Sequence, residues 1–163
     1  MKMKNNKITF NLADEKATIK LAERFADVSN DNFCCHLIGD LGAGKTCFVR
    51  AYLRQKGCKE TIKSPTYTLM ESYSINKKEY YHMDLYRLED PEELDFLGIR
   101  DMDNNNCFFI EWPDHGINYI IPADIVINIR HDKKGRTLSF TTLSPKGINT
   151  IKKLTNHNDK NIS

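Results

Sequence analysis

One segment of the chain combines glycines, a lysine and a threonine at the spacing that binds phosphate. Gly39 is followed after four residues by Gly44-Lys45-Thr46, which matches the phosphate-loop pattern G-x-x-x-x-G-K-[ST]. Glycines let backbone N–H groups turn toward phosphate oxygens, and the helix that follows adds its positive N-terminal end. We expect Lys45 to reach the β- and γ-phosphates and the Thr46 hydroxyl to bind Mg²⁺. The other loop residues expected at the nucleotide are Gly42, Ala43 and Cys47.

Two carboxylates follow apolar runs and are candidates to help hold that ion. Mg²⁺ prefers hard oxygen ligands and keeps several waters. Glu111 follows the apolar run 107–110, and Asp84 follows the run 80–83. If both runs are strands, the two carboxylates lie at the carboxyl edge of a sheet, where the phosphate loop also opens. Glu111 has the more uniformly apolar run behind it and is favoured as the metal ligand.

His82 lies in the run that precedes Asp84. We interpret it as a strand histidine with a satisfied hydrogen bond rather than as a catalytic base. Joint metal ligation by His82 and Asp84 is the alternative.

A buried strand and a helix should flank the phosphate loop. Residues 33–38 are a continuous apolar run of strand length, as expected for a parallel strand covered on both faces. From Lys45 the pattern becomes helical, and Gly57 is a plausible C-terminal stop. The sequence therefore predicts strand, loop and helix in the order that phosphate binding requires.

The remaining pattern predicts further strands and helices around this unit. A strand over 7–12 is followed by a helix to Val28, with helix-start chemistry offered by Asn11 and Asp14-Glu15. Proline begins a short helix over 91–97. Two strand pairs are expected, at 67–75 with 79–85 around the turn 76–78, and at 125–129 with 137–143 around the turn 132–135.

These elements indicate an α/β fold of the P-loop nucleoside triphosphate hydrolase type. We expect a mixed sheet with a parallel centre and antiparallel edge strands, flanked by helices. The 163 residues have the length of a single domain, 1–163. Residues 144–163 are polar and are predicted to form a peripheral tail, with a short helix and a frayed end.

Composition excludes several classes of protein. The chain is 40% apolar and 28% charged, and it contains no run near the roughly 20 apolar residues that span a bilayer. The net charge of +2 balances 24 basic against 22 acidic residues, so tight direct binding to tRNA or DNA is not predicted. The basic first residues lack the apolar stretch of a secretory signal. Five cysteines without a C-x-x-C pair are typical of a reduced, cytoplasmic protein.

The motifs alone do not decide which base the bound nucleotide carries or which reaction the protein catalyses. The segment nearest to the guanine-reading Asn-Lys-x-Asp pattern is Asn76-Lys77-Lys78-Glu79, whose last residue is wrong, and we interpret it as a hairpin turn. Adenine is therefore favoured by elimination. A small-molecule kinase on the same fold is a rival hypothesis.

Four segments of the chain together resemble the bacterial TsaE (YjeE) family of ATPases, which take part in making threonylcarbamoyladenosine in tRNA. The resemblance covers residues 8 to about 143, and the order and spacing of the segments make it specific, whereas the first alone is widespread. The segments are Gly39-Asp40-Leu41-Gly42-Ala43-Gly44-Lys45-Thr46, Ser64-Pro65-Thr66-Tyr67-Thr68-Leu69, His82-Met83-Asp84-Leu85-Tyr86-Arg87-Leu88 with Asp90-Pro91-Glu92-Glu93-Leu94, and Ile110-Glu111-Trp112-Pro113.

The resemblance implies roles for individual residues. Glu111 would be the second magnesium ligand beside Thr46. Asp84 matches an aspartate that hydrolysis needs, so that Asp84 and Lys45 would be catalytic. Thr66 would lie near the γ-phosphate on a mobile switch loop. The residues that would border the nucleotide are Glu15, Trp112 and Arg136, although Glu15 is equally well explained as a helix-start acid.

The resemblance also implies partners. The family works with the TsaB and TsaD proteins, which transfer the threonylcarbamoyl group, so tRNA would be met only through the complex. The leading hypothesis is a Mg²⁺-dependent ATPase subunit that binds ATP or ADP and is weak alone. The alternatives are a small-molecule kinase and a nucleotide-sensing module with little turnover. No membrane contact is expected, and the oligomeric state stays open.

Overall fold

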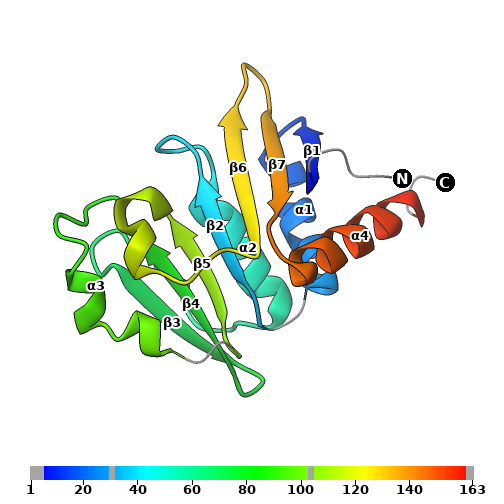
Figure 1. Ribbon diagram of the computed structural model, residues 1–163. Helices are drawn as coiled ribbons and strands as arrows, with labels where there is room; N and C mark the ends of the chain where they lie inside the picture. The colour runs from blue at the N-terminus through cyan, green and yellow to red at the C-terminus, as the bar shows by residue number, and fades with distance from the viewer. Residues whose placement is uncertain (1–5, 30–31, 103–104, 161–163) are drawn as a thin grey trace.

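A single mixed sheet organises the molecule. The computed structural model describes residues 6–29, 32–102 and 105–160, and within them seven strands pair in the order β1-β7-β6-β2-β5-β4-β3 (Figure 1). The neighbours β6, β2, β5 and β4 run parallel, whereas β7, β1 and β3 are added in antiparallel pairs. The predicted mixed sheet with a parallel centre and antiparallel edge strands is confirmed. The strands are β1 (Lys7–Leu12), β2 (Cys34–Ile38), β3 (Met70–Ile75), β4 (Lys78–Asp84), β5 (Cys107–Glu111), β6 (Ile125–His131) and β7 (Arg136–Thr142).

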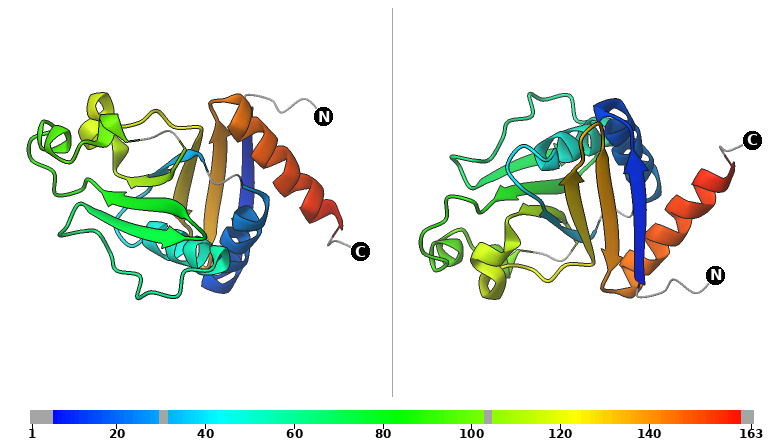
Figure 2. Two further views of the ribbon diagram at one scale, coloured as in Figure 1. Left: turned by 90° about the horizontal axis from the view of Figure 1, so that it is seen from below. Right: turned by 90° about the horizontal axis from the view of Figure 1, so that it is seen from above.

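Helices cover the two faces of the sheet unequally (Figure 2). Helices α1 (Glu15–Val28) and α2 (Lys45–Lys56) lie on one face, where α4 (Pro145–Lys160) also adds side chains to the core. On the opposite face, a smaller core lies under α3 (Glu93–Phe96), η2 (Ile99–Asp101) and η3 (Pro113–Tyr119). Strand β5 contributes to both, because alternate side chains of a strand point to opposite faces.

Aromatic side chains fill the larger core. Phe25 of α1 meets Phe48 and Tyr52 of α2, with ring centroids 5.9 and 5.6 Å apart. Tyr52 packs edge-on against Phe109 of β5 at 4.7 Å. The helix that follows the phosphate loop is therefore anchored to the strand that ends at Glu111, and rings packed in this way restrict movement between the two.

Local signals account for several element boundaries. The Asp14 side chain accepts a hydrogen bond of 2.9 Å from the Ala17 N–H and caps α1. Gly57 ends α2 in the left-handed conformation that glycine tolerates. Asn76 and Lys77, both with positive φ, form the tight turn of the β3–β4 hairpin.

The structure corrects two predicted boundaries. The strand expected from Tyr67 begins at Met70, because Leu69 has a φ of 66° and cannot continue an extended segment. The segment 144–163 was expected to be a peripheral tail with a short helix. Instead α4 has 16 residues, and its Ile151 and Leu154 are fully buried in the larger core.

None of the helices in the described part of the chain is both long enough and apolar enough to cross a membrane.

We predict that Leu154→Ala lowers the free energy of unfolding by about 2–5 kcal/mol, because it leaves a cavity between α4 and the sheet. The exposed neighbour Lys153 provides the matched control, and Lys153→Ala should change the value by less than about 0.5 kcal/mol. Urea unfolding followed by circular dichroism measures both. Equal stability of Leu154→Ala and the wild type would contradict the burial of α4.

Candidate functional site

The phosphate loop turns sharply between the end of β2 and the start of α2. Gly42 and Gly44 have φ values of 78° and 114°, which glycine adopts without strain. A Cβ on Gly39 would lie 2.5 Å from the Ile129 carbonyl oxygen, so close approach to β6 also requires glycine there. Gly44 caps α2 without a side-chain hydrogen bond. The free N–H groups of the first helical turn therefore remain available to an anion.

Lys45 folds back over the loop. Its ammonium group donates hydrogen bonds to the carbonyl oxygens of Gly39 and Asp40, the latter at 3.0 Å, and only 5% of the residue is exposed. Burial lowers the pKa of Lys45 below its usual value, and the carboxylates of Glu111, Asp84 and Asp40 partly offset this shift. A buried cation whose hydrogen-bond acceptors are loop carbonyl groups is well suited to receive phosphate oxygens.

Thr46 and Glu111 meet directly at the carboxyl edge of the sheet. The Thr46 hydroxyl donates to the two Glu111 carboxylate oxygens at distances of 3.1 and 3.3 Å. Glu111 also contacts His82, whose Nε2 lies 2.6 Å from Oε2. In the described residues there is no cluster of three or more His, Cys, Asp or Glu side chains that could hold a metal on its own. An ion between Thr46 and Glu111 would therefore take its other ligands from phosphate and water.

Asp84 lies beside Glu111, because the two residues are register partners on β4 and β5. The Asp84 Oδ2 accepts a hydrogen bond of 3.2 Å from the Thr66 hydroxyl, and Oδ1 accepts one of 3.0 Å from the Tyr86 N–H. Thr66 belongs to a segment, residues 61–69, that contains turns but no helix or strand. The Thr66 hydroxyl therefore joins this loop to the strand-end carboxylate.

Trp112 follows Glu111 in an unusual backbone conformation. Its φ of 55° is rare for a bulky residue and reverses the chain as β5 ends. The Lys45 ammonium lies 4.7 Å from the centre of the Trp112 ring. The indole thus forms one wall beside the phosphate loop.

Arg136, at the start of β7, reaches the loop from the other side. Its Nη1 is buried and has no hydrogen-bond partner among the described residues. A Cβ on Gly44 would lie 2.7 Å from this nitrogen, so the guanidinium is packed against the loop. Its Nη2 lies 3.8 Å from Oε2 of Glu15, and the Cys47 thiol is 3.7 Å from the other oxygen of Glu15.

These side chains surround a cavity of about 340 Å³. Most of the predicted residues line it, whereas Gly39, Ala43 and Glu15 lie behind or beside its lining. A second hollow of about 770 Å³ lies between the β1–α1 turn and the β6–β7 hairpin, and the two share Arg136. The cavity at the phosphate loop is lined by Leu41, Gly42, Gly44, Lys45, Thr46, Cys47, Thr66, Asp84, Glu111, Trp112 and Arg136.

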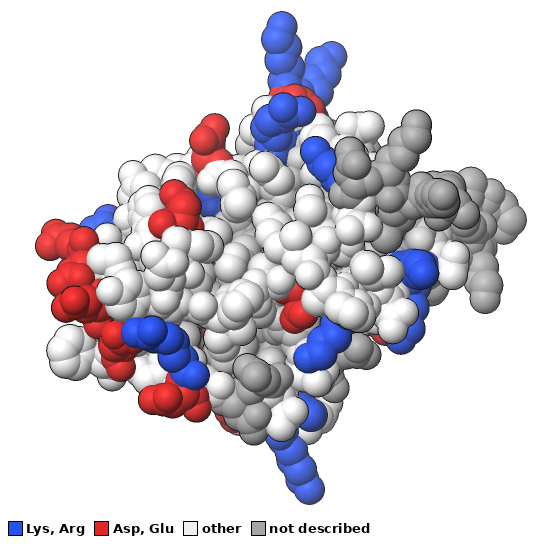
Figure 3. Space-filling model, in the orientation of Figure 1, with Lys and Arg blue, Asp and Glu red and all other residues white. Residues whose placement is uncertain are grey.

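Acidic side chains gather at the left of the face shown in Figure 3, whereas basic side chains stand at its top and are scattered over its lower and right-hand parts. Acidic residues gather over the α3 region, where Glu89, Asp90, Glu92, Glu93 and Asp95 are exposed. Basic residues gather at the tip of the β6–β7 hairpin, with Arg130, Lys133 and Lys134 exposed. No continuous basic surface crosses this face.

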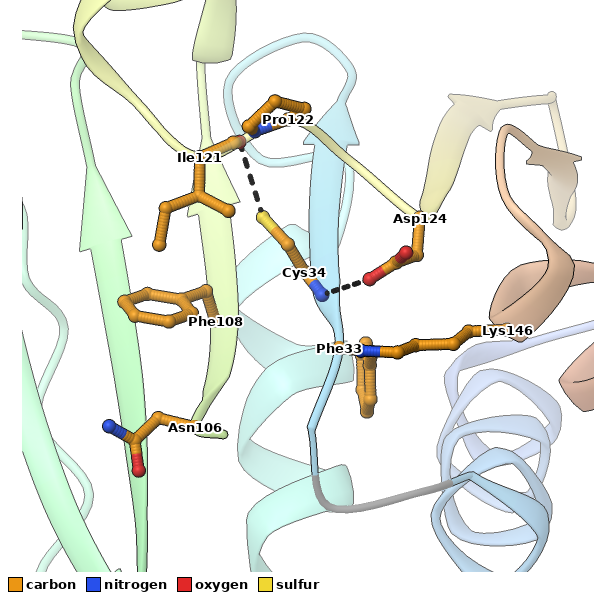
Figure 4. Close-up of a pocket in the computed structure, with 8 residues that line it drawn as sticks. All are labelled: Phe33, Cys34, Asn106, Phe108, Ile121, Pro122, Asp124 and Lys146. Carbon is orange, nitrogen blue, oxygen red and sulfur yellow. Dashed lines mark hydrogen bonds between the residues drawn. The ribbon is translucent and has the colours of Figure 1, made fainter. Parts of the chain in front are cut away.

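Another cavity, of about 210 Å³, lies at the opposite edge of the sheet, where β2 begins (Figure 4). There the Cys34 N–H donates to Asp124 Oδ2 at 2.9 Å, and the Ser144 hydroxyl donates to Oδ1 at 2.6 Å. Burial, followed by the charge of Asp124, raises the pKa of the Cys34 thiol far above its usual value. Asp124 thereby connects the start of β2 with Ser144, and the raised pKa keeps the thiol protonated, the form that is a poor nucleophile.

His82 lies next to the site, and the sequence did not reveal which residue its side chain contacts. The predicted strand histidine does make a buried hydrogen bond, but its partner is Glu111, 29 residues away. The available signal was its position two residues before Asp84, which puts both side chains on one face of the strand.

Comparisons with known proteins place the chain among named relatives. The family model described as "Threonylcarbamoyl adenosine biosynthesis protein TsaE" matches residues 12–138. A protein of Haemophilus influenzae named "tRNA threonylcarbamoyladenosine biosynthesis protein TsaE" is 39% identical over 91% of this chain and 98% of its own length. A Bacillus subtilis protein of the same name is 32% identical over 93% and 94%. The crystal structure of B. subtilis YdiB superposes with a TM-score of 0.73 at 22% identity, covering 93% of this chain and 96% of that one.

The half-buried Cys47 offers a test of the site's electrostatics. Burial and then Glu15 raise the pKa of its thiol above the usual 9.0, and Arg136 only partly opposes them. Because the thiolate is the reactive form, alkylation by iodoacetamide should increase with a midpoint above pH 9.0. Mass spectrometry of the Cys47 peptide measures the rate, and Cys47→Ser is the control for labelling of the buried cysteines. A midpoint at or below the usual value would contradict the described packing around Cys47.

Proposed function

Because the chain belongs to the TsaE family and acts in threonylcarbamoyladenosine formation, we propose that it is the Mg²⁺-dependent ATPase subunit of that process. It binds ATP and ADP, is weakly active alone, and supports threonylcarbamoyl transfer to a tRNA adenosine together with TsaB and TsaD. The observation that carries this proposal is the direct contact of Thr46 with Glu111 at the mouth of the phosphate loop.

The residues present fit a magnesium ion. A hydroxyl and a carboxylate supply hard oxygen atoms, and the two groups are already close enough to share one ion. Mg²⁺ would neutralise charge that develops on the phosphates during transfer. Thr46 and Glu111 would hold the ion, as the family resemblance implies.

The remaining polar groups can bind the phosphates and position water. Lys45 exchanges its two carbonyl acceptors for phosphate oxygens, which costs little because the ammonium is already buried and oriented. Asp84 orients the attacking water with Oδ2, the oxygen that now accepts from Thr66. Thr66 is thereby freed to face the terminal phosphate.

Arg136 connects the phosphate cavity with the nucleoside. Its unpartnered, buried Nη1 lacks an acceptor that a phosphate oxygen would supply. The larger hollow that shares Arg136, lined also by Leu12 and Ala13, has room for ribose and base. We assign the nucleoside to this hollow.

Partner proteins supply the rest of the reaction. The scattered basic side chains of the face in Figure 3 and the net charge of +2 favour docking on a protein complex over direct contact with tRNA. TsaB and TsaD are the proposed partners, on the family resemblance.

We predict that purified protein binds ADP with Mg²⁺, hydrolyses ATP slowly, and is stimulated when TsaB and TsaD are added. Asp84→Asn should lower kcat in the complex by about 100-fold or more while leaving ADP affinity nearly unchanged, because it affects the water rather than the nucleotide. Phosphate release measures turnover, and calorimetry measures binding.

The exposed Asp90→Asn, close to Asp84 in the sequence, is the matched control and should behave as the wild type. Absence of any effect of TsaB and TsaD on turnover would contradict the proposed role. Phosphate transfer from ATP to a metabolite instead of water would favour a kinase.

A further inference from the structure

His82 is a buried polar side chain to which the proposed hydrolysis assigns no role. It lies on β4 two residues before Asp84, and it is 1% exposed. Since side chains two apart on a strand share a face, His82 lies below Asp84 and points toward α2, as Tyr80 does in the larger core. It therefore lies under the edge where Thr46, Asp84 and Glu111 meet.

The contact of His82 with Glu111 is short and fully enclosed. Nε2 lies 2.6 Å from Oε2, and the two side chains are 1% and 3% exposed. A carboxylate only accepts hydrogen bonds, so Nε2 carries the proton and donates it. Nδ1 is buried and has no hydrogen-bond partner among the described residues, so Glu111 is the group that holds the ring there.

The two oxygens of Glu111 are held differently as a result. Oε2 is bound by His82 at 2.6 Å and by the Thr46 hydroxyl at 3.1 Å, whereas among the described residues Oε1 is contacted by the Thr46 hydroxyl alone, at 3.3 Å. Without the histidine, the terminal torsion of a glutamate is soft and the carboxylate can rotate freely. The His82 hydrogen bond removes this freedom and holds the carboxylate with both oxygens within reach of the Thr46 hydroxyl, leaving Oε1 without a second partner among the described residues.

We propose that His82 is a positioning residue for the metal site, which holds the Glu111 carboxylate in the orientation that faces Thr46 and the ion bound with it. This inference rests on the proposed function. Groups behind a metal ligand fix its orientation, and removing such a group costs metal affinity without removing a ligand. A histidine on β4 would thus tune a metal ligand on β5 without touching ion or nucleotide.

The inference is tested by replacing His82 in two ways. His82→Gln keeps an N–H donor close to the place of Nε2, and His82→Leu removes the donor while filling the space. Mn²⁺ binding to the ADP-saturated full-length protein, followed by electron paramagnetic resonance, measures the metal. We expect His82→Leu to bind Mn²⁺ about 10- to 100-fold more weakly, and His82→Gln to stay within about threefold of the wild type. ADP affinity in the presence of EDTA should not change in either variant.

His36 provides a matched control. It is also a buried strand histidine, on β2, and its Nε2 donates to the Ile121 carbonyl at 2.9 Å on the other face of the sheet. His36→Leu removes a comparable hydrogen bond and should leave Mn²⁺ affinity unchanged. If His36→Leu lowered Mn²⁺ affinity as much as His82→Leu does, the loss would reflect general destabilisation of the protein, and the proposal would be overturned.

Two further outcomes also decide whether His82 positions Glu111. Wild-type Mn²⁺ affinity in His82→Leu, with weakened binding in Glu111→Ala, would overturn the positioning role and leave the proposed function intact. Failure of Glu111→Ala to weaken Mn²⁺ binding would instead contradict the metal site itself. If His82→Leu does not fold, His82→Asn, whose amide lies nearer the place of Nδ1, replaces it with the same expected loss.

Discussion

The register of three parallel strands is the constraint on which the site depends. Leu37 on β2 and Asp84 on β4 both pair with Glu111 on β5, so the phosphate loop and two carboxylates emerge at one edge of the sheet. A shift of one residue in β5 would turn Glu111 to the opposite face, because side chains alternate along a strand. The buried aromatic contact between Tyr52 and Phe109 holds α2 against β5 and maintains this alignment.

Burial of charge is the cost of this arrangement. Lys45, Asp84 and Glu111 are each at most 6% exposed, and buried charges destabilise a fold unless they are paired and hydrogen-bonded. Here loop carbonyls hold the cation, while His82, Thr46, Thr66 and the Tyr86 N–H bind the carboxylates. The same groups are thereby oriented before a ligand arrives, which reduces the reorganisation that binding requires.

Much of this site could be predicted because its parts are local in the sequence. The phosphate loop carries its own glycine, lysine and threonine signals, and Asp84 and Glu111 are each marked by an apolar run that ends at them. The pairing of β1 with β7, by contrast, joins residues 130 positions apart, such as Thr9 and Ser139. No turn motif encodes such a contact.

Other features escaped prediction for specific physical reasons. Leu69 takes a left-handed conformation that its residue type disfavours, so propensity placed the start of β3 too early. The few apolar residues of 144–163 stand at helical spacing and indicate a helix, but the polar composition around them suggested a peripheral one, whereas the core buries Ile151 and Leu154. The partner of His82 depends on the neighbouring strand, which is known only once the order β5-β4 is known.

A crystal structure of the complex with ADP and Mn²⁺, with anomalous scattering to locate the ion, shows directly where the metal and the phosphates bind. We expect one Mn²⁺ ion between the Thr46 hydroxyl, the Glu111 carboxylate and the β-phosphate, with Lys45 moved from the loop carbonyls onto phosphate oxygens. An ion bound elsewhere, or a nucleotide whose phosphates lie outside the loop 39–46, would contradict it.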